Sequence, residues 1–143
     1  GGGILIQEGA RTRVLAESDG LPSNEVLDLC LDSQQRIWAA TRSGLALIGQ
    51  GRITAYTSRE GLPANYIRCL QEVPGMPGMM LGTIGQGLIY FDGNRFHPLM
   101  AGMREIPSVY ALHWQSAKLW IATDDGYYSW ERQGGLVHFG LAT

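Results

Sequence analysis

Apolar residues occur along the chain in short runs that are rich in β-branched and aromatic side chains. Glycine, proline, asparagine and aspartate separate the runs, as is typical of strands joined by tight turns. The runs follow one another so closely that they leave no room for helices. The expected strands are residues 3–7, 11–16, 25–31, 36–41, 44–49, 52–57, 66–72, 78–83, 87–91, 94–98, 108–114, 118–123, 126–131 and 135–139.

A sequence repeat organises these strands. Asp19–Asn24 recurs as Glu60–Asn65, and Ile106–Ser108 is a degenerate third copy. A second set of matching segments keeps the same order, each ending in threonine and followed by a glycine and another apolar run: Arg36–Thr41, Gly78–Thr83 and Lys118–Thr123. Both sets give four strands per unit and a period of about 40–45 residues, which is the period of a β-propeller blade.

The sequence therefore predicts an all-β fold, a β-propeller fragment of about three and a half four-stranded antiparallel blades. The chain is expected to be a single partial propeller that divides into a half blade, 1–18, and the blades 19–59, 60–101 and 102–143. Because an arc leaves sheet faces and edges uncovered, we expect it to be completed by missing propeller blades or by a second copy in a homodimer. An independent small sandwich is the alternative fold, but the regular spacing favours the propeller.

Composition limits the partners. The 143 residues are 45% hydrophobic, and 11 basic against 13 acidic residues give a net charge of -2. Nucleic acid and direct membrane contact are not expected, because both need a broad positive field. No apolar stretch approaches the roughly 18 residues of a membrane-spanning helix. Because the chain begins with Gly1 rather than methionine, it is expected to be a processed chain or a piece of a longer protein.

The repeat resembles the two-component regulator propeller repeat, whose pattern runs from an Asp-Gly-Leu-Pro-x-Asn turn to Leu-Trp-x-Gly-Thr and Gly-Leu. The second unit departs from this pattern by placing Met80 where the tryptophan belongs, and the third unit loses Gly-Leu-Pro. The residues that carry the resemblance in the first unit are Asp19–Asn24, Val26, Asp32, Ile37–Thr41, Gly44 and Leu45.

The resemblance implies a ligand- or partner-sensing propeller region of a bacterial membrane-bound signal-transduction receptor, on the periplasmic or extracellular face of the membrane. The output modules of such receptors, a histidine kinase or a diguanylate cyclase, are not in this sequence. This chain is therefore expected not to be an enzyme, although its parent protein could carry such a module. The alternatives are a propeller lyase acting on cyclic peptides, which would need a metal and a general base that these residues do not visibly supply, and a scaffolding propeller.

Propeller topology places the loop before each first strand on the same face as the turn between the second and third strands. That face gathers polar side chains and one aromatic ring, which suits a small ligand such as a carbohydrate or a peptide. The opposite face holds tight-turn residues such as Ser33–Gln35 and Asp92–Asn94, which are expected to be structural. The candidate ligand-binding residues are Asn24, Arg42, Ser43, Asn65, Tyr66, Gln86, Asp124 and Asp125.

Other conspicuous residues have structural interpretations. Trp38 and Trp120 recur at one strand position and are expected to wedge between neighbouring blades, and Leu21 and Leu62 are expected to tuck between blades. The repeated threonines are expected to bond neighbouring backbone where each second strand ends. No cofactor and no metal site are expected, because the histidines lack ligand-like spacing. These histidines are His97, His113 and His138.

Two further pairs of residues are expected neither to act in catalysis nor to form a disulfide. Asp124 and Asp125 adjoin on a turn and point apart, so they do not suit the opposed carboxylates of glycosidic cleavage. Cys30 and Cys69 fall two residues apart once the repeat is subtracted, so their side chains face successive blades. A disulfide between them is not expected, and both thiols should be free and buried.

Overall fold

The structure, a computed structural model, describes residues 2–140. Strands dominate this part of the chain, and all fourteen expected strands are present with only their ends displaced. Their bounds are β1 Ile4–Glu8, β2 Arg11–Leu15, β3 Val26–Leu31, β4 Ile37–Thr41, β5 Gly44–Gly49, β6 Arg52–Tyr56, β7 Ile67–Gln71, β8 Met79–Thr83, β9 Leu88–Phe91, β10 Phe96–Pro98, β11 Val109–Gln115, β12 Lys118–Thr123, β13 Gly126–Glu131 and β14 Gly135–Phe139.

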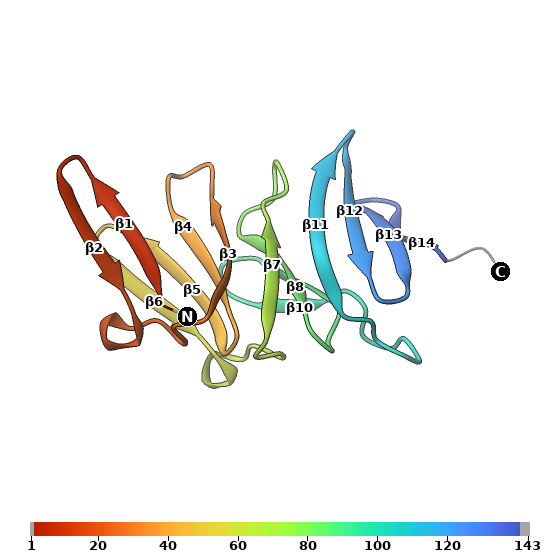
Figure 1. The fold of residues 1–143 in the computed structure, drawn as a ribbon. Coiled ribbons are helices and arrows are strands. Elements are labelled where there is room, and N and C mark those ends of the chain that lie inside the picture. Colours follow the sequence, from red (N-terminus) through yellow and green to blue (C-terminus); the bar gives the residue numbers. More distant parts are fainter. Residues whose placement is uncertain (1, 141–143) are drawn as a thin grey trace.

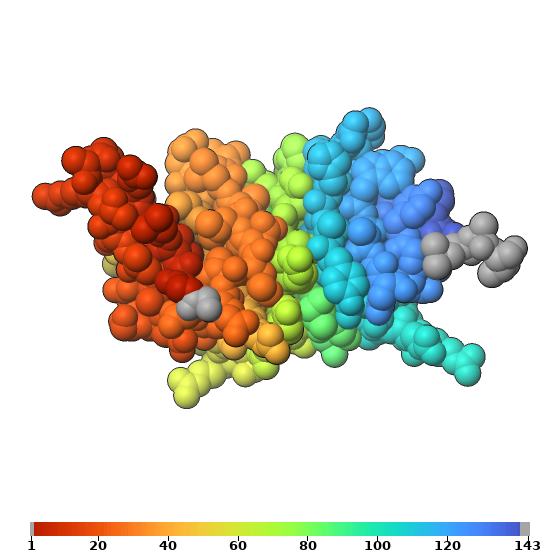
Figure 2. Space-filling model, viewed as in Figure 1, coloured from red at the N-terminus to blue at the C-terminus, as the bar shows by residue number. Residues whose placement is uncertain are grey.

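The strands form four antiparallel sheets that stand side by side in chain order (Figure 1). The first is the two-stranded β1–β2 hairpin, and the others are the four-stranded blades β3–β6, β7–β10 and β11–β14. The space-filling view shows the same order of packed units (Figure 2). The expectation of a β-propeller fragment is confirmed, whereas the unit boundaries at residues 18, 59 and 101 stay a prediction.

The first strand of each blade carries the same irregularity. The pairing of β3 with β4 shifts register between Val26 and Asp28, and equivalent shifts interrupt β7 and β11. A bulge inserts one extra residue and increases the local twist of a strand. Because the bulge recurs at one position of the repeat, the three blades share their backbone geometry as well as their sequence pattern.

Apolar cores hold neighbouring sheets together. One core lies between the β1–β2 hairpin and the first blade, a second between the first and second blades, and a third between the second and third blades. Leu21 is 4% exposed in the first core and Leu62 is 4% exposed in the second, as expected for residues tucked between sheets. Burial of apolar side chains between the sheets is therefore the main term that stabilises the row.

The two equivalent tryptophans differ in burial. Trp38 is 1% exposed and meets Phe91 of the second blade edge-on, with ring centroids 5.9 Å apart. Trp120 is only half-buried, and it lies with Tyr127 and Phe139 on the face of β11–β14 that points away from the second blade. The expectation that Trp120 wedges between blades is wrong for residues 2–140, because no sheet in that range covers this face.

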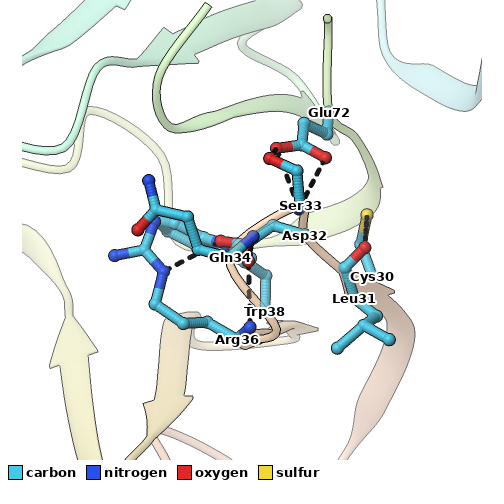
Figure 3. A network of polar contacts seen from close by, with 8 residues as sticks. All are labelled: Cys30, Leu31, Asp32, Ser33, Gln34, Arg36, Trp38 and Glu72. Atoms are coloured by element: carbon cyan, nitrogen blue, oxygen red, sulfur yellow. Dashed lines mark hydrogen bonds and ion pairs between the residues drawn. The ribbon is translucent and has the colours of Figure 1, made fainter.

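The β3–β4 turn is stabilised by a buried carboxylate (Figure 3). Asp32 accepts hydrogen bonds from Trp38 Nε1 at 2.8 Å, Arg36 Nε at 2.9 Å and the backbone N–H groups of Gln34 and Arg36 at 2.9 Å. Burial alone would raise the pKa of Asp32, but these bonds outweigh it and lower the pKa. Ser33, in the same turn, is bonded to Glu72 of the second blade. This turn is structural, as expected.

Two one-turn 3-10 helices depart from the expectation that helices have no room: η1 Glu17–Asp19 and η2 Ser58–Glu60. The acid that ends each turn accepts a hydrogen bond from the backbone N–H three residues before it, Asp19 from Ala16 and Glu60 from Thr57. Gly20 and Gly61 follow with φ of 114° and 94°, values that favour glycine. The repeated acid-glycine pair is therefore a small capped turn that leads into the first and second blades.

The two cysteines are free. Cys30 packs against the core between the first and second blades, and Cys69 lies in the core between the second and third. Cys69 is 6% exposed, but Cys30 is only half-buried, which corrects the expectation of two buried thiols. Burial raises the pKa of the Cys69 thiol to about 12, so this sulfur stays protonated and unreactive at neutral pH.

Candidate functional site

The loops that enter the blades and the turns between second and third strands lie at the same end of the sheets. Figure 1 shows the entering loops along the lower edge of the row, opposite the β3–β4, β7–β8 and β11–β12 turns. Backbone hydrogen bonds join loop and turn in every blade: Arg42 N–H to Glu25 O at 3.1 Å, Ile84 N–H to Tyr66 O at 3.0 Å and Asp124 N–H to Ser108 O at 3.3 Å. The predicted gathering of these segments is confirmed, and we call this end the loop edge.

Threonines fix the shape of the loop edge. The hydroxyl groups of Thr41, Thr83 and Thr123 each donate at 2.8 Å to the carbonyl of a glycine at the start of the next strand or directly before it. The same oxygens accept backbone N–H groups from Ser43, Gln86 and Asp125. The expectation that these threonines bond neighbouring backbone is confirmed. Their hydroxyl groups are consequently engaged in holding the turns.

Arg42 and Tyr66 meet across the boundary between the first and second blades. The guanidinium carbon of Arg42 lies 5.1 Å from the centre of the Tyr66 ring, within the range of a cation–π contact. Glu25 Oε2 lies 3.5 Å from Arg42 Nη1. Both charged side chains remain at least half exposed, so their ion pair contributes little to stability and both groups are accessible to a ligand.

Asn65, Tyr66 and Gln86 line an open groove beside this pair, together with Pro63 and Ile84. The groove offers amide donors and acceptors next to an aromatic ring. Four predicted residues, Arg42, Asn65, Tyr66 and Gln86, are therefore brought together around one ring. Such a set suits a ligand that presents hydroxyl, amide or carboxylate groups over a flat apolar surface.

The other predicted site residues lie outside this group. Asn24 Oδ1 accepts from the Glu17 backbone N–H at 2.7 Å, so this side chain fastens the entering loop. Asp124 accepts from the Ser108 N–H at 3.0 Å, and Asp125 Oδ2 lies 3.6 Å from His138 Nε2 within the third blade. Ser43 is exposed beside Arg42 in the β4–β5 turn. The candidate site is therefore reduced to Arg42, Asn65, Tyr66 and Gln86, at the boundary between the first and second blades.

A second hollow, which the sequence analysis missed, lies at the opposite end between the β1–β2 hairpin and the first blade. Residues from five strands, β1, β2, β4, β5 and β6, line it, and so no local sequence motif marks it. Its lining includes Ile6, Glu8, Arg13, Gln35, Ile37 and Ile48.

Within the described residues, no group of three or more histidine, cysteine, aspartate or glutamate side chains is placed to hold a metal ion. Of the helices between residues 2 and 140, none has the length and apolar character to span a bilayer.

Four sheets stacked in chain order, with the polar loops of all blades at one end, define a fragment of a β-propeller. Residues 20–43 match the family model described as two component regulator propeller. The first full blade therefore contains a two-component regulator propeller repeat, and the resemblance seen in the sequence is confirmed. A search of curated proteins found no match.

Solved structures share the arrangement. The extracellular domain of the putative hybrid two component system BT3049 from B. thetaiotaomicron is 21% identical, with a TM-score of 0.74 over 90% of this chain. The corresponding domain of BT4673 from the same organism is 18% identical, with a TM-score of 0.76 over 93% of this chain. This chain spans 20% and 19% of those two chains, about a fifth of each. At this level of identity, the comparison establishes the propeller fold.

Proposed function

We propose that the chain is part of a sensing propeller in a bacterial membrane-bound signalling receptor and is not itself catalytic. The observation that carries the proposal is the two-component regulator propeller match at residues 20–43. The similarity of the fold to extracellular domains of putative two-component systems supports it. A place on the periplasmic or extracellular side of the membrane belongs to the same proposal.

The ligand site of the proposal is the boundary of the first two blades at the loop edge. Tyr66 supplies a flat ring, Arg42 a positive charge and Asn65 and Gln86 neutral hydrogen-bonding groups. A carbohydrate or a peptide presents groups that pair with all three. Sites of this kind on a rigid scaffold bind by recognition and need no catalytic residue.

Ligand binding tests the site. A panel of oligosaccharides and short peptides is titrated into the 143-residue chain by calorimetry, and Arg42→Ala and Tyr66→Ala should weaken any binding at least tenfold. Arg42→Ala should leave the free energy of unfolding within about 0.5 kcal/mol of wild type, because it is a surface change. Arg52→Ala is the matched control, since Arg52 is an exposed arginine away from the loop edge. Binding that survives both site variants would place the ligand elsewhere.

The parent reading frame tests the receptor role. A membrane helix followed by a histidine kinase or diguanylate cyclase module is the expected result. Metal-dependent turnover of a cyclic peptide by the purified protein would instead favour the propeller lyase, and a parent with neither signalling module nor ligand would favour a scaffold.

A further inference from the structure

The β1–β2 hairpin has an open edge. Between residues 2 and 140, β1 pairs only with β2, whereas the equivalent strands β5, β9 and β13 each lie between two strands. Glu8 and Arg11 close a two-residue turn and therefore form a hydrogen-bonded pair, after which bonded and non-bonded pairs alternate. Leu5 and Gln7 consequently direct their backbone N–H and C=O groups to the open edge.

β3, the neighbouring strand of the first blade, carries an exposed leucine, whereas the equivalent leucines of the other two blades are more buried. Leu29 of β3, Leu70 of β7 and Leu112 of β11 occupy the same register position, opposite Ala39, Leu81 and Ile121. Leu70 is 6% exposed in the core that contains Trp38, whereas Leu29 is 49% exposed. The difference arises because the sheet that precedes β7 has four strands and the sheet that precedes β3 has two.

The backbone N–H of Leu29 also differs from its equivalent in the second blade. Leu70 N–H donates at 2.9 Å to Asp28 Oδ2 of the preceding blade. Leu29 N–H has no preceding first strand within residues 2–140 and donates instead to Asp28 Oδ1, its own neighbour, at 2.9 Å. An additional strand beside β3, with aspartate at this position, would restore the bond made between the first two blades.

We propose that the open edge of β1 pairs with a β-hairpin made of a further copy of the first two strands of this repeat, which would also cover the exposed Leu29 of β3. The chain itself shows the fit, because β3–β4, β7–β8 and β11–β12 are three such hairpins in the equivalent place. A second copy of this chain does not supply one, since all three hairpins are already paired within its own sheets. The source is therefore a polypeptide segment outside these 143 residues. This inference concerns assembly of the propeller and is independent of the proposed ligand.

A peptide with the sequence of residues 25–43 is the probe, with Cys30→Ser to avoid disulfides. It contains Asp28, Trp38 and Asp32, and the hydrogen bonds that the Asp32 carboxylate accepts are all internal to the hairpin. Fluorescence anisotropy of the labelled peptide should show saturable binding to the 143-residue chain at submicromolar protein, and a scrambled peptide should not bind.

Two proline variants locate the binding edge. Gln7→Pro removes an N–H group that points to the open edge and should weaken peptide binding at least tenfold. Thr12→Pro is the matched control, because Thr12 is paired opposite Gln7, is also exposed and directs its N–H to the outer edge of β2. Binding to the control should equal that of wild type.

Hydrogen exchange on the wild-type chain tests the same contact without any substitution. The amides of Leu5, Gln7 and Leu29 should become at least tenfold more protected when the peptide is bound. Equal binding to both proline variants, unchanged exchange at these amides, or a dimer of the chain that Gln7→Pro abolishes while no peptide binds would each overturn the proposal.

Discussion

Trp38 combines two stabilising roles in one side chain. Its ring fills the core between the first and second blades, and its Nε1 group donates to the buried carboxylate of Asp32. Trp120 has the same place in the repeat, but its Nε1 group donates to the Gln115 carbonyl, at 3.3 Å, and its ring packs beside rings of its own sheet. Both residues are tryptophan, and the presence or absence of a covering sheet decides how much each contributes to stability.

Trp38→Ala should lower the free energy of unfolding by about 3–5 kcal/mol, because it removes a large buried ring. Trp120→Ala should cost only about 1 kcal/mol, the scale of an exposed aromatic pair. Chemical denaturation of both variants measures the difference, at a protein concentration below that at which the chain self-associates. Equal losses would mean that Trp120 is covered in solution.

Asp32→Asn should reveal a pH-dependent contribution. The pKa of Asp32 is lowered in the folded state, so its stabilisation is fully present above the ordinary aspartate value of about 3.9 and is lost as the pH falls through the folded value. At neutral pH the variant should be less stable by about 1–3 kcal/mol, because the buried Trp38 N–H and the partly exposed Arg36 guanidinium lose a charged acceptor. Denaturant midpoints from pH 7 to pH 3 should converge, and parallel curves would contradict this role.

At the scale of single residues, the sequence predicts interactions within one repeat unit better than contacts with a neighbouring sheet. The threonine bonds and the tucked leucines follow from the repeat, because they depend on residues within one unit. The contact of Arg42 with Tyr66 and the exposure of Trp120 do not follow, because each depends on a neighbouring sheet whose distance the local pattern does not encode.

The strands show how tightly two sheets approach. Gly82 of β8 pairs with Cys69 of β7, and a methyl group added to it would press on the Cys69 sulfur and lie 2.6 Å from Val109 Cγ1 of the third blade. The equivalent residue of the first blade is Ala40, which pairs with Asp28. Small residues at this position therefore set the spacing between blades.

Gly82→Ala should destabilise the chain by about 1–3 kcal/mol, the usual cost of overpacking. Replacing the sulfur as well, in the double variant Gly82→Ala with Cys69→Ala, should recover part of the loss. Thermal unfolding of the two single variants and the double variant measures this coupling. Additive losses would show that Cys69 is not the neighbour that resists the methyl group.

Strand positions were predictable at this level and the short helices were not. Period, turn residues and β-branched runs mark each strand. A three-residue 3-10 helix leaves no periodic signal, and the acids that cap η1 and η2 are indistinguishable in sequence from other turn acids.

For the whole molecule, the cores between successive sheets make stability a sum of neighbouring contacts, as in other repeat proteins. Among residues 2–140, two sheet faces are left uncovered. One carries Leu5 and Val14, 66% and 52% exposed, and the other carries Trp120, Tyr127 and Phe139.

The 143-residue chain should self-associate at micromolar concentration, because extensive apolar faces rarely stay bare in monomers. Light scattering measures its mass. Tyr127→Lys should reduce association, and Tyr110→Lys should not, although the two tyrosines are 50% and 47% exposed. A monodisperse wild-type monomer would contradict the expectation.

The inequality of these two faces has a consequence for any such assembly. A contact between identical patches closes at two copies, but an aliphatic face meeting an aromatic face leaves one of each free at the ends of every oligomer. Growth is then head-to-tail, and unless the rotation per copy closes a ring, mass should rise continuously with concentration rather than stop at a dimer. In an open filament of this kind, every copy would run in the same N-to-C direction through its blades, so the two ends of the filament would differ.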